Sequence, residues 1–176
     1  MLIRLFAIIV LVIIPAASSF GEGEIVPQEY LIKAKYVLNL PLFTEVPSQK
    51  KSGTTYTICL IGNTPLESVL VLSEGKQIKN RPMAIRKVSD SGQLDSCQVV
   101  FIATSERYRL QQLLPVAHQF GIMTISDMRD FTKMGGMVSL VSVNNRITYD
   151  LNLVAARAAG VSFSAQILKL ANDVIN

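Results

Sequence analysis

Apolar residues recur along this chain in short blocks separated by glycine, proline and asparagine, and their spacing differs between blocks. Over residues 28–42 the apolar positions fall three and four residues apart, which predicts an amphipathic helix. Residues 54–61 and 98–103 are mostly apolar and rich in β-branched side chains, which predicts strands buried on both faces of a sheet. The pattern therefore indicates a mixed α/β protein.

The remaining blocks complete the order of elements. After the first helix and strand we expect a helix over 65–73, an exposed strand over 83–88, the strand over 98–103, a helix over 106–119, a strand over 122–125, a hairpin of strands 137–143 and 146–151, a helix from Asn152 and a last helix over 165–174. Strands joined through helices predict a parallel sheet covered on both faces. The expected fold is one α/β domain, a three-layer sandwich whose mostly parallel sheet carries a C-terminal β-hairpin.

Turn and cap residues support these boundaries. Asn144 and Asn145 tolerate the positive φ that a two-residue hairpin turn requires. Gly135 and Gly136 precede a strand and not a helix, so they cannot present helix N–H groups to a phosphate. We interpret this pair as a tight turn or a bulge. Thr104 or Ser105 is expected to cap the helix over 106–119, and Ser164 the last helix.

The first 21 residues have the organisation of a secretory signal peptide. Arg4 is followed by ten apolar residues and then by Pro15 and small side chains. Cleavage is expected either after Ser19 or after Gly21. Ten apolar residues span about half of a hydrocarbon core, which argues against a membrane anchor. We expect a signal peptide over 1–21, a single domain over 22–176 and a periplasmic location. Cleavage lowers the net charge from +4 to +3, too small an excess to indicate nucleic-acid binding.

The two cysteines, Cys59 and Cys97, have a single possible pairing. In an oxidising compartment such a pair favours a disulfide. The bridge would close a loop of about 38 residues, worth about 4 kcal/mol in the chain-entropy model. Two buried free thiols are the alternative. Two cysteines and one distant histidine are too few ligands for a metal site.

No constellation of catalytic residues stands out in the sequence. His118, the only histidine, lies late in a predicted helix, and the chain has no nucleophile elbow, Walker lysine loop or dinucleotide-binding glycine motif. Asp127 and Asp130 are interpreted as turn or cap residues, and Asp150 and Asn152 as structural. We therefore predict no catalytic residue, metal or cofactor.

Two groups of polar residues are candidates for binding. Asn63 and Thr64 follow one predicted strand and Ser105 follows another, so all three should meet where ligands bind in open α/β sheets, although ordinary helix capping explains them equally well. Basic residues form the second group, which is either a surface for an anion or partner or a solvated face: Lys76, Lys79, Arg81, Arg86, Lys87, Arg107 and Arg109.

The order and spacing of many short motifs resemble the YfiR-like family of periplasmic proteins. The motifs are Lys33-Ala34, Tyr36 and Asn39, Phe43-Thr44-Glu45-x-Pro47, Cys59 to Gly62, Asn80-Arg81-Pro82, Cys97, Val99 to Ile102, Ile125-Ser126-Asp127, Phe131, Gly135-Gly136-Met137, Asn144-Asn145-Arg146, Asn152-Leu153, Ala156-x-x-Ala159-Gly160 and Leu168 to Ala171. The resemblance covers essentially the whole chain after the signal. Val46 departs from it, because the family usually has tryptophan before this proline.

The resemblance implies a function that composition does not show. It implies a non-enzymatic repressor that binds the periplasmic sensor domain of an inner-membrane diguanylate cyclase and holds cyclic-di-GMP synthesis down, and so regulates biofilm formation. It also implies a Cys59–Cys97 disulfide, sequestration by an outer-membrane peptidoglycan-associated lipoprotein, and a homodimer. The polar hairpin and helix residues Asn145, Arg146 and Arg157 are our candidates for the partner-binding surface. The alternative is a periplasmic small-ligand-binding module of a receptor or transporter that uses the crevice at Asn63, Thr64 and Ser105.

Overall fold

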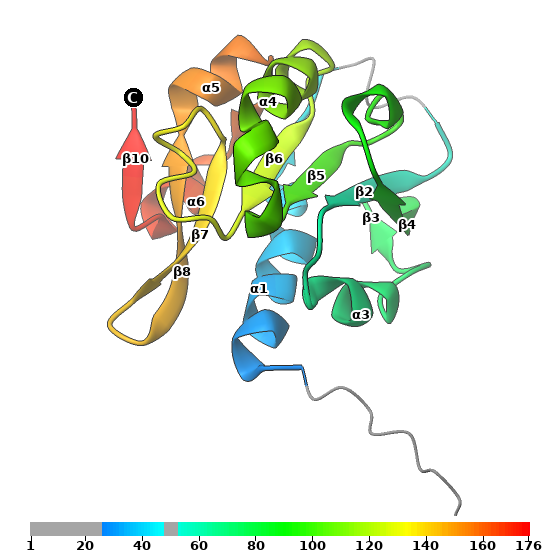
Figure 1. Cartoon of the computed structure of the whole chain (residues 1–176), viewed down its shortest axis with the longest axis horizontal. Coiled ribbons are helices and arrows are strands. Elements are labelled where there is room, and N and C mark those ends of the chain that lie inside the picture. The colour runs from blue at the N-terminus through cyan, green and yellow to red at the C-terminus, as the bar shows by residue number, and fades with distance from the viewer. Residues whose placement is uncertain (1–25, 48–52) are drawn as a thin grey trace, which may run out of the picture.

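The structure is a computed structural model that describes residues 26–47 and 53–176. An eight-stranded sheet in the order β10-β8-β7-β6-β5-β2-β4-β3 runs through it (Figure 1). The strands are β2 (Tyr56–Ile61), β3 (Gln77–Ile78), β4 (Arg81–Val88), β5 (Val99–Ile102), β6 (Met123–Ser126), β7 (Val138–Val143), β8 (Arg146–Asn152) and β10 (Asp173–Ile175). Pairing is parallel from β7 through β6, β5 and β2 to β4, and antiparallel only between β7 and β8 and between β4 and β3. The predicted mostly parallel sheet is confirmed.

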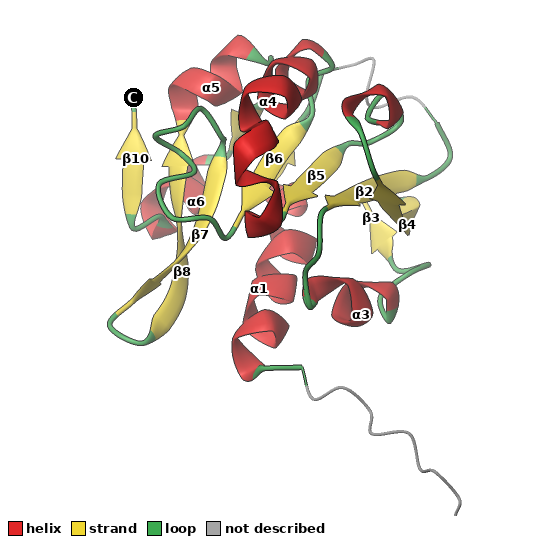
Figure 2. Cartoon of the chain, viewed as in Figure 1, coloured by secondary structure: helices red, strands yellow, loops and turns green. Residues whose placement is uncertain are grey.

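Helices cover both faces of the sheet (Figure 2). They are α1 (Gln28–Asn39), α3 (Leu66–Val71), α4 (Leu110–Gln119), α5 (Leu153–Ala158) and α6 (Ala165–Leu170). Because strand side chains alternate, β2 feeds two cores. Ile58 and Leu60 pack with α1, α3 and α6, whereas Cys59 and Ile61 pack with α4 on the opposite face. This is the expected three-layer sandwich.

The closing hairpin forms as predicted. Val143 pairs with Arg146 across a two-residue turn in which Asn144 and Asn145 have φ values of 49° and 61°. Positive φ at both central positions gives the twist that a two-residue hairpin needs. Asn152 then begins α5 by accepting a 2.8 Å hydrogen bond from the N–H of Ala155. The predicted turn and this helix cap are both confirmed.

The caps predicted at Thr104 and Ser105 are wrong. The chain after β5 first forms a 3₁₀ helix, η3 (Thr104–Arg109), which has Ala103 at its N-cap and no side-chain cap. Both hydroxyls have partners elsewhere, since Thr104 donates to Asp127 Oδ1 at 3.3 Å and Ser105 accepts from the N–H of Asn63 at 3.1 Å. The α-helix itself starts only at Leu110.

The last predicted helix is too long, and Ser164 makes no side-chain cap hydrogen bond. Helix α6 ends at Leu170, and the chain then turns to extended geometry at Ala171. The N–H of Asn172 donates to the carbonyl of Tyr149 at 2.8 Å, and β10 then pairs with the end of β8. Pairing at this edge satisfies main-chain groups of β8 that a continued helix would leave without partners.

Two shorter features complete the fold. The 3₁₀ segments η1 (Leu40–Phe43) and η2 (Ser91–Gln93) connect larger elements, and β1 (Thr44–Glu45) pairs antiparallel with β9 (Ser162–Phe163) in a separate small sheet.

The predicted signal peptide over 1–21 lies outside the described residues. Among residues 26–47 and 53–176, no helix is both long enough and apolar enough to cross a membrane.

Candidate functional site

The crevice predicted at the carboxyl ends of the strands brings its three residues together. The N–H of Asn63 donates to Ser105 Oγ at 3.1 Å, and Thr64 Oγ1 accepts from the N–H of Leu66 at 3.3 Å, at the start of α3. Gly62 has a φ of +85°, and a Cβ there would lie 2.5 Å from Ser105 Oγ. Ser105 therefore packs directly on the backbone of Gly62, and no room for a ligand is left between these two residues.

Shallow polar hollows flank this contact. One has a volume of about 430 Å³ and is lined by Asn63, Thr64 and Lys87, among others. Lys87 Nζ already lies 2.8 Å from Glu67 Oε2, and in the neighbouring hollow Arg109 pairs with Glu106 at 2.9 Å. Lys87 and Arg109 are thus both paired with carboxylates of the protein itself.

A buried ion pair lies nearby, at the ends of β5 and β6. Lys33 Nζ is 2.8 Å from Asp127 Oδ2 and 3.1 Å from Glu29 Oε1, and it lies 4.5 Å from the centre of the Tyr30 ring. Only 10% of the Lys33 and Asp127 side chains is exposed. Burial lowers the pKa of Lys33, but the hydrogen bonds with Asp127 and Glu29 and the charges of these two carboxylates together outweigh burial and raise the pKa overall.

Sequence reasoning missed Lys33 as a site residue and interpreted Asp127 as a turn or cap residue. The signal was present, because Lys33 falls one turn before Val37 on the apolar face of α1 and a lysine there needs a buried partner. Asp127 serves as that partner. The turn at this point is instead supported by Ser126, whose Oγ accepts the N–H of Met128 at 3.0 Å.

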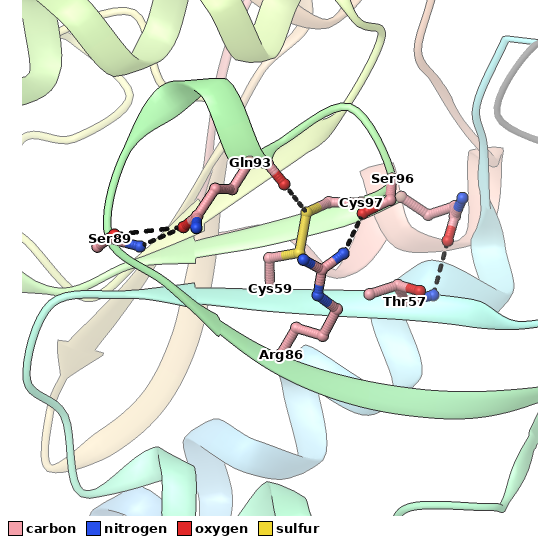
Figure 3. Close-up of a disulfide and its surroundings, with 8 residues drawn as sticks. Thr57, Cys59, Arg86, Ser89, Gln93, Ser96 and Cys97 are labelled. Carbon is pink, nitrogen blue, oxygen red and sulfur yellow. Dashed lines mark hydrogen bonds between the residues drawn. A yellow bond between two sulfur atoms is a disulfide. The ribbon is translucent and has the colours of Figure 1, made fainter.

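The two cysteines form a disulfide between β2 and the segment that enters β5 (Figure 3). Both are fully buried in the core beneath α4. Next to them, Thr57 and Gln98 exchange two hydrogen bonds, one of 2.6 Å from the N–H of Thr57 to Gln98 Oε1 and one of 3.0 Å from the N–H of Gln98 to the Thr57 carbonyl. On the other side, Arg86 of β4 donates to Ser96. The disulfide therefore crosslinks β2 to the start of β5, its neighbour in the sheet.

The candidate partner-binding residues lie at two places in the fold. Asn145 and Arg146 lie at the tip of the hairpin, whereas Arg157 lies on α5 at the other end of β8 (Figure 1). The seven residues of β8 separate them by about 20 Å at a strand rise of roughly 3.3 Å per residue. All three are exposed.

All seven residues of the predicted basic group make contacts within the protein. Lys79 pairs with Glu45, Lys87 with Glu67 and Arg109 with Glu106. The remaining members also have contacts: Lys76 with Ser73, Arg81 with the Tyr56 ring, Arg86 with Ser96 and Arg107 with the Arg129 carbonyl. Of the two interpretations of the basic group, these contacts favour a solvated face over a surface for an anion or partner.

The Phe43 to Pro47 motif is structural. The carbonyl of Phe43 accepts from the N–H of Ser164 at 2.9 Å, and Val46 is buried in the core. A Cβ on Gly121 would lie 2.4 Å from Pro47 Cγ, so this proline packs directly on the glycine backbone. The motif fastens the end of η1 to the C-terminal part of the chain.

The fold defines the class of this protein: it is a single-domain α/β protein whose sheet has helices on both faces. The residues that the structure describes contain no cluster of three or more histidine, cysteine, aspartate or glutamate side chains that could hold a metal ion. The chain matches the YfiR/HmsC-like family over residues 30–172 and belongs to that family. None of the curated proteins matches it.

Two solved structures share the fold. One is a conserved domain protein from Vibrio cholerae O1 biovar El Tor, with a TM-score of 0.51, 13% identity, and coverage of 67% of this chain and 54% of that chain. The other is the ABC domain in complex with L-Trp from Streptococcus pneumoniae, with a TM-score of 0.52, 10% identity, and coverage of 83% of this chain and 60% of that chain. This chain thus spans less than two thirds of either protein, and the similarity concerns the fold alone.

Proposed function

We propose that the protein is a non-enzymatic periplasmic regulator that binds the periplasmic sensor domain of an inner-membrane diguanylate cyclase and represses it. Membership of the YfiR/HmsC-like family over residues 30–172 is the observation that carries the proposal. The secretory pattern of residues 1–21 and the buried Cys59–Cys97 disulfide agree with an oxidising compartment outside the cytoplasm.

The mechanism is a shift of population in the cyclase. A protein that binds only the inactive conformation of the sensor domain stabilises that conformation by its differential binding free energy. To move the cyclase from 99% active to 99% inactive, it must bind the inactive state about 10⁴-fold more tightly than the active one. No chemical step by the regulator is required.

The alternative is a small-ligand-binding module. It is supported by the contact between Asn63 and Ser105 and by the polar hollows beside it. The ion pairs of Lys87 and Arg109 in those hollows weaken the case, because an anionic ligand would have to displace Glu67 or Glu106.

Deletion of the gene tests the proposal in cells. We expect cyclic-di-GMP to rise on deletion and to return to the starting level when the gene is restored. The increase should vanish in a strain in which the catalytic domain of the regulated cyclase is inactivated. An unchanged cyclic-di-GMP level after deletion would contradict repression.

A further inference from the structure

A preformed apolar groove lies between α1 and α6, on the sheet face opposite α4. It has a volume of about 310 Å³ and is lined chiefly by Ile32, Tyr36, Leu40, Phe43, Ile167 and Leu170. That volume is at the lower end of the roughly 300–1,000 Å³ found for binding pockets. It suits one or two inserted side chains.

Two tyrosines fix the shape of the groove. Tyr36 donates from its hydroxyl to the carbonyl of Ile147 at 3.0 Å, and Tyr149 donates to the carbonyl of Ile167 at 2.8 Å. Their rings meet edge to face with centroids 5.5 Å apart. Since both hydroxyls are satisfied within the protein, the rings present apolar surface, and little ordering is needed when a partner binds.

The mouth of the groove is apolar and exposed. Leu170 is 65% exposed and Phe43 is 36% exposed, although both are large hydrophobic residues. Exposed apolar groups that line a concave surface are typical of a protein-binding site, in contrast to single scattered ones.

The charge around the groove is positive. Lys35 lines it and Lys169 precedes Leu170 on α6, and both side chains are exposed. Neither has a hydrogen bond or an ion pair within the described part of the chain, unlike Lys33, which is doubly paired. No acidic residue lines the groove.

The positive charge beside the groove distinguishes between two possible occupants, a second copy of this chain and a segment of another protein. A second copy docked through the same face about a two-fold axis would bring two positively charged faces together, which is unfavourable. An acidic partner segment would instead be attracted. We propose that the groove receives an apolar side chain of the membrane signalling protein, carried on a segment with acidic residues beside it. This inference rests on the proposed function and names the surface that serves it.

The test measures binding of the purified protein to the full-length cyclase in lipid nanodiscs. Leu170→Glu should weaken binding about tenfold or more, because it removes an apolar contact and repels the acidic segment. Lys35→Glu should also weaken binding and should reduce its salt dependence. Leu72→Glu and Arg129→Glu are matched controls at exposed positions outside the groove, and they should leave the affinity within about threefold of the original.

The outcomes separate the two proposals. If the unaltered protein binds and both groove variants bind equally well, the groove is overturned and the proposed function stands. If the unaltered protein does not bind the cyclase, both are overturned. If the protein is a dimer that Leu170→Glu dissociates, the occupant is a second copy and the acidic partner is wrong.

Discussion

Lys33 of α1 and Asp127 at the end of β6 form a buried ion pair with 2.8 Å between Nζ and Oδ2. The pair joins the first helix to the middle of the sheet across 94 residues of sequence. Thr104, at the end of β5, donates to the second oxygen of the same carboxylate. The carboxylate of Asp127 thus links α1 to the ends of two neighbouring strands.

Removing one partner of this pair should be costly. We expect Lys33→Met to lower the free energy of unfolding by about 3–5 kcal/mol, because it leaves the carboxylate of Asp127 buried without a counter-ion. Urea unfolding measures this change. Lys133→Met, which breaks an exposed pair with Asp130, is the control and should have no measurable effect. Equal stability of Lys33→Met and the original protein would contradict the role of the pair.

His118 should make stability sensitive to mild acid. Burial lowers its pKa from the ordinary value of 6.5, and this effect outweighs a contact with the backbone of Gly135 that raises the pKa. A depressed pKa in the folded state contributes stability above the unfolded pKa, and that contribution is lost as pH falls through the folded pKa.

The loss between pH 7.5 and pH 5 should therefore be smaller in His118→Gln than in the original protein. Unfolding in urea at several pH values measures it. Parallel pH profiles of the two proteins would show that His118 makes no such contribution.

Reduction of the disulfide should destabilise the domain. The bridge closes a loop of 38 residues. In the chain-entropy model it is worth about 4 kcal/mol, which corresponds to roughly 10 °C in Tm for a domain of this size. Thermal unfolding with and without reductant measures the effect. The double variant Cys59→Ala/Cys97→Ala should melt lower and should not respond to reductant. Identical melting of the original protein under both conditions would contradict this expectation.

Gly136 should not tolerate a side chain. A Cβ there would lie 2.1 Å from Cε1 of Phe131, a fully buried ring. We expect Gly136→Ala to cost about 1–3 kcal/mol through overpacking. Gly92→Ala is the control, since its Cβ would meet only the flexible carboxylate of Asp90 at 3.1 Å. Recovery of stability in Gly136→Ala/Phe131→Leu would identify the clash as the cause, and no recovery would point elsewhere.

Much of the fold could be predicted because its signals are local. The buried run of β2, the Asn144-Asn145 turn and the cap at Asn152 each depend on a few adjacent residues. The interpretation of the glycine pair as a turn also agrees with the structure, where Gly135 has a φ of +95°.

The errors arose where distant contacts decide the structure. Thr104 and Ser105 looked like caps, but their hydroxyls bond to Asp127 and Asn63. The last helix ends early because the edge of β8 accepts the chain as β10. Neither contact leaves a periodic pattern in the sequence.

The two candidate binding features also differ in how far the sequence predicts them. The crevice at Asn63 and Ser105 followed from the rule for open α/β sheets, and the structure does bring these residues together. The apolar groove could not be predicted from the sequence, because it forms only when α6 packs beside η1. That packing places Ile167 and Leu170 next to Leu40 and Phe43. Its apolar residues are indistinguishable from core residues in the sequence.

The central claim is that this protein represses a membrane diguanylate cyclase by binding it. The most direct measurement is the rate of cyclic-di-GMP synthesis by the full-length cyclase in nanodiscs as the purified, oxidised protein is added. We predict a saturable decrease in rate whose midpoint equals the dissociation constant of the complex. A rate that stays constant at saturating protein would contradict the account.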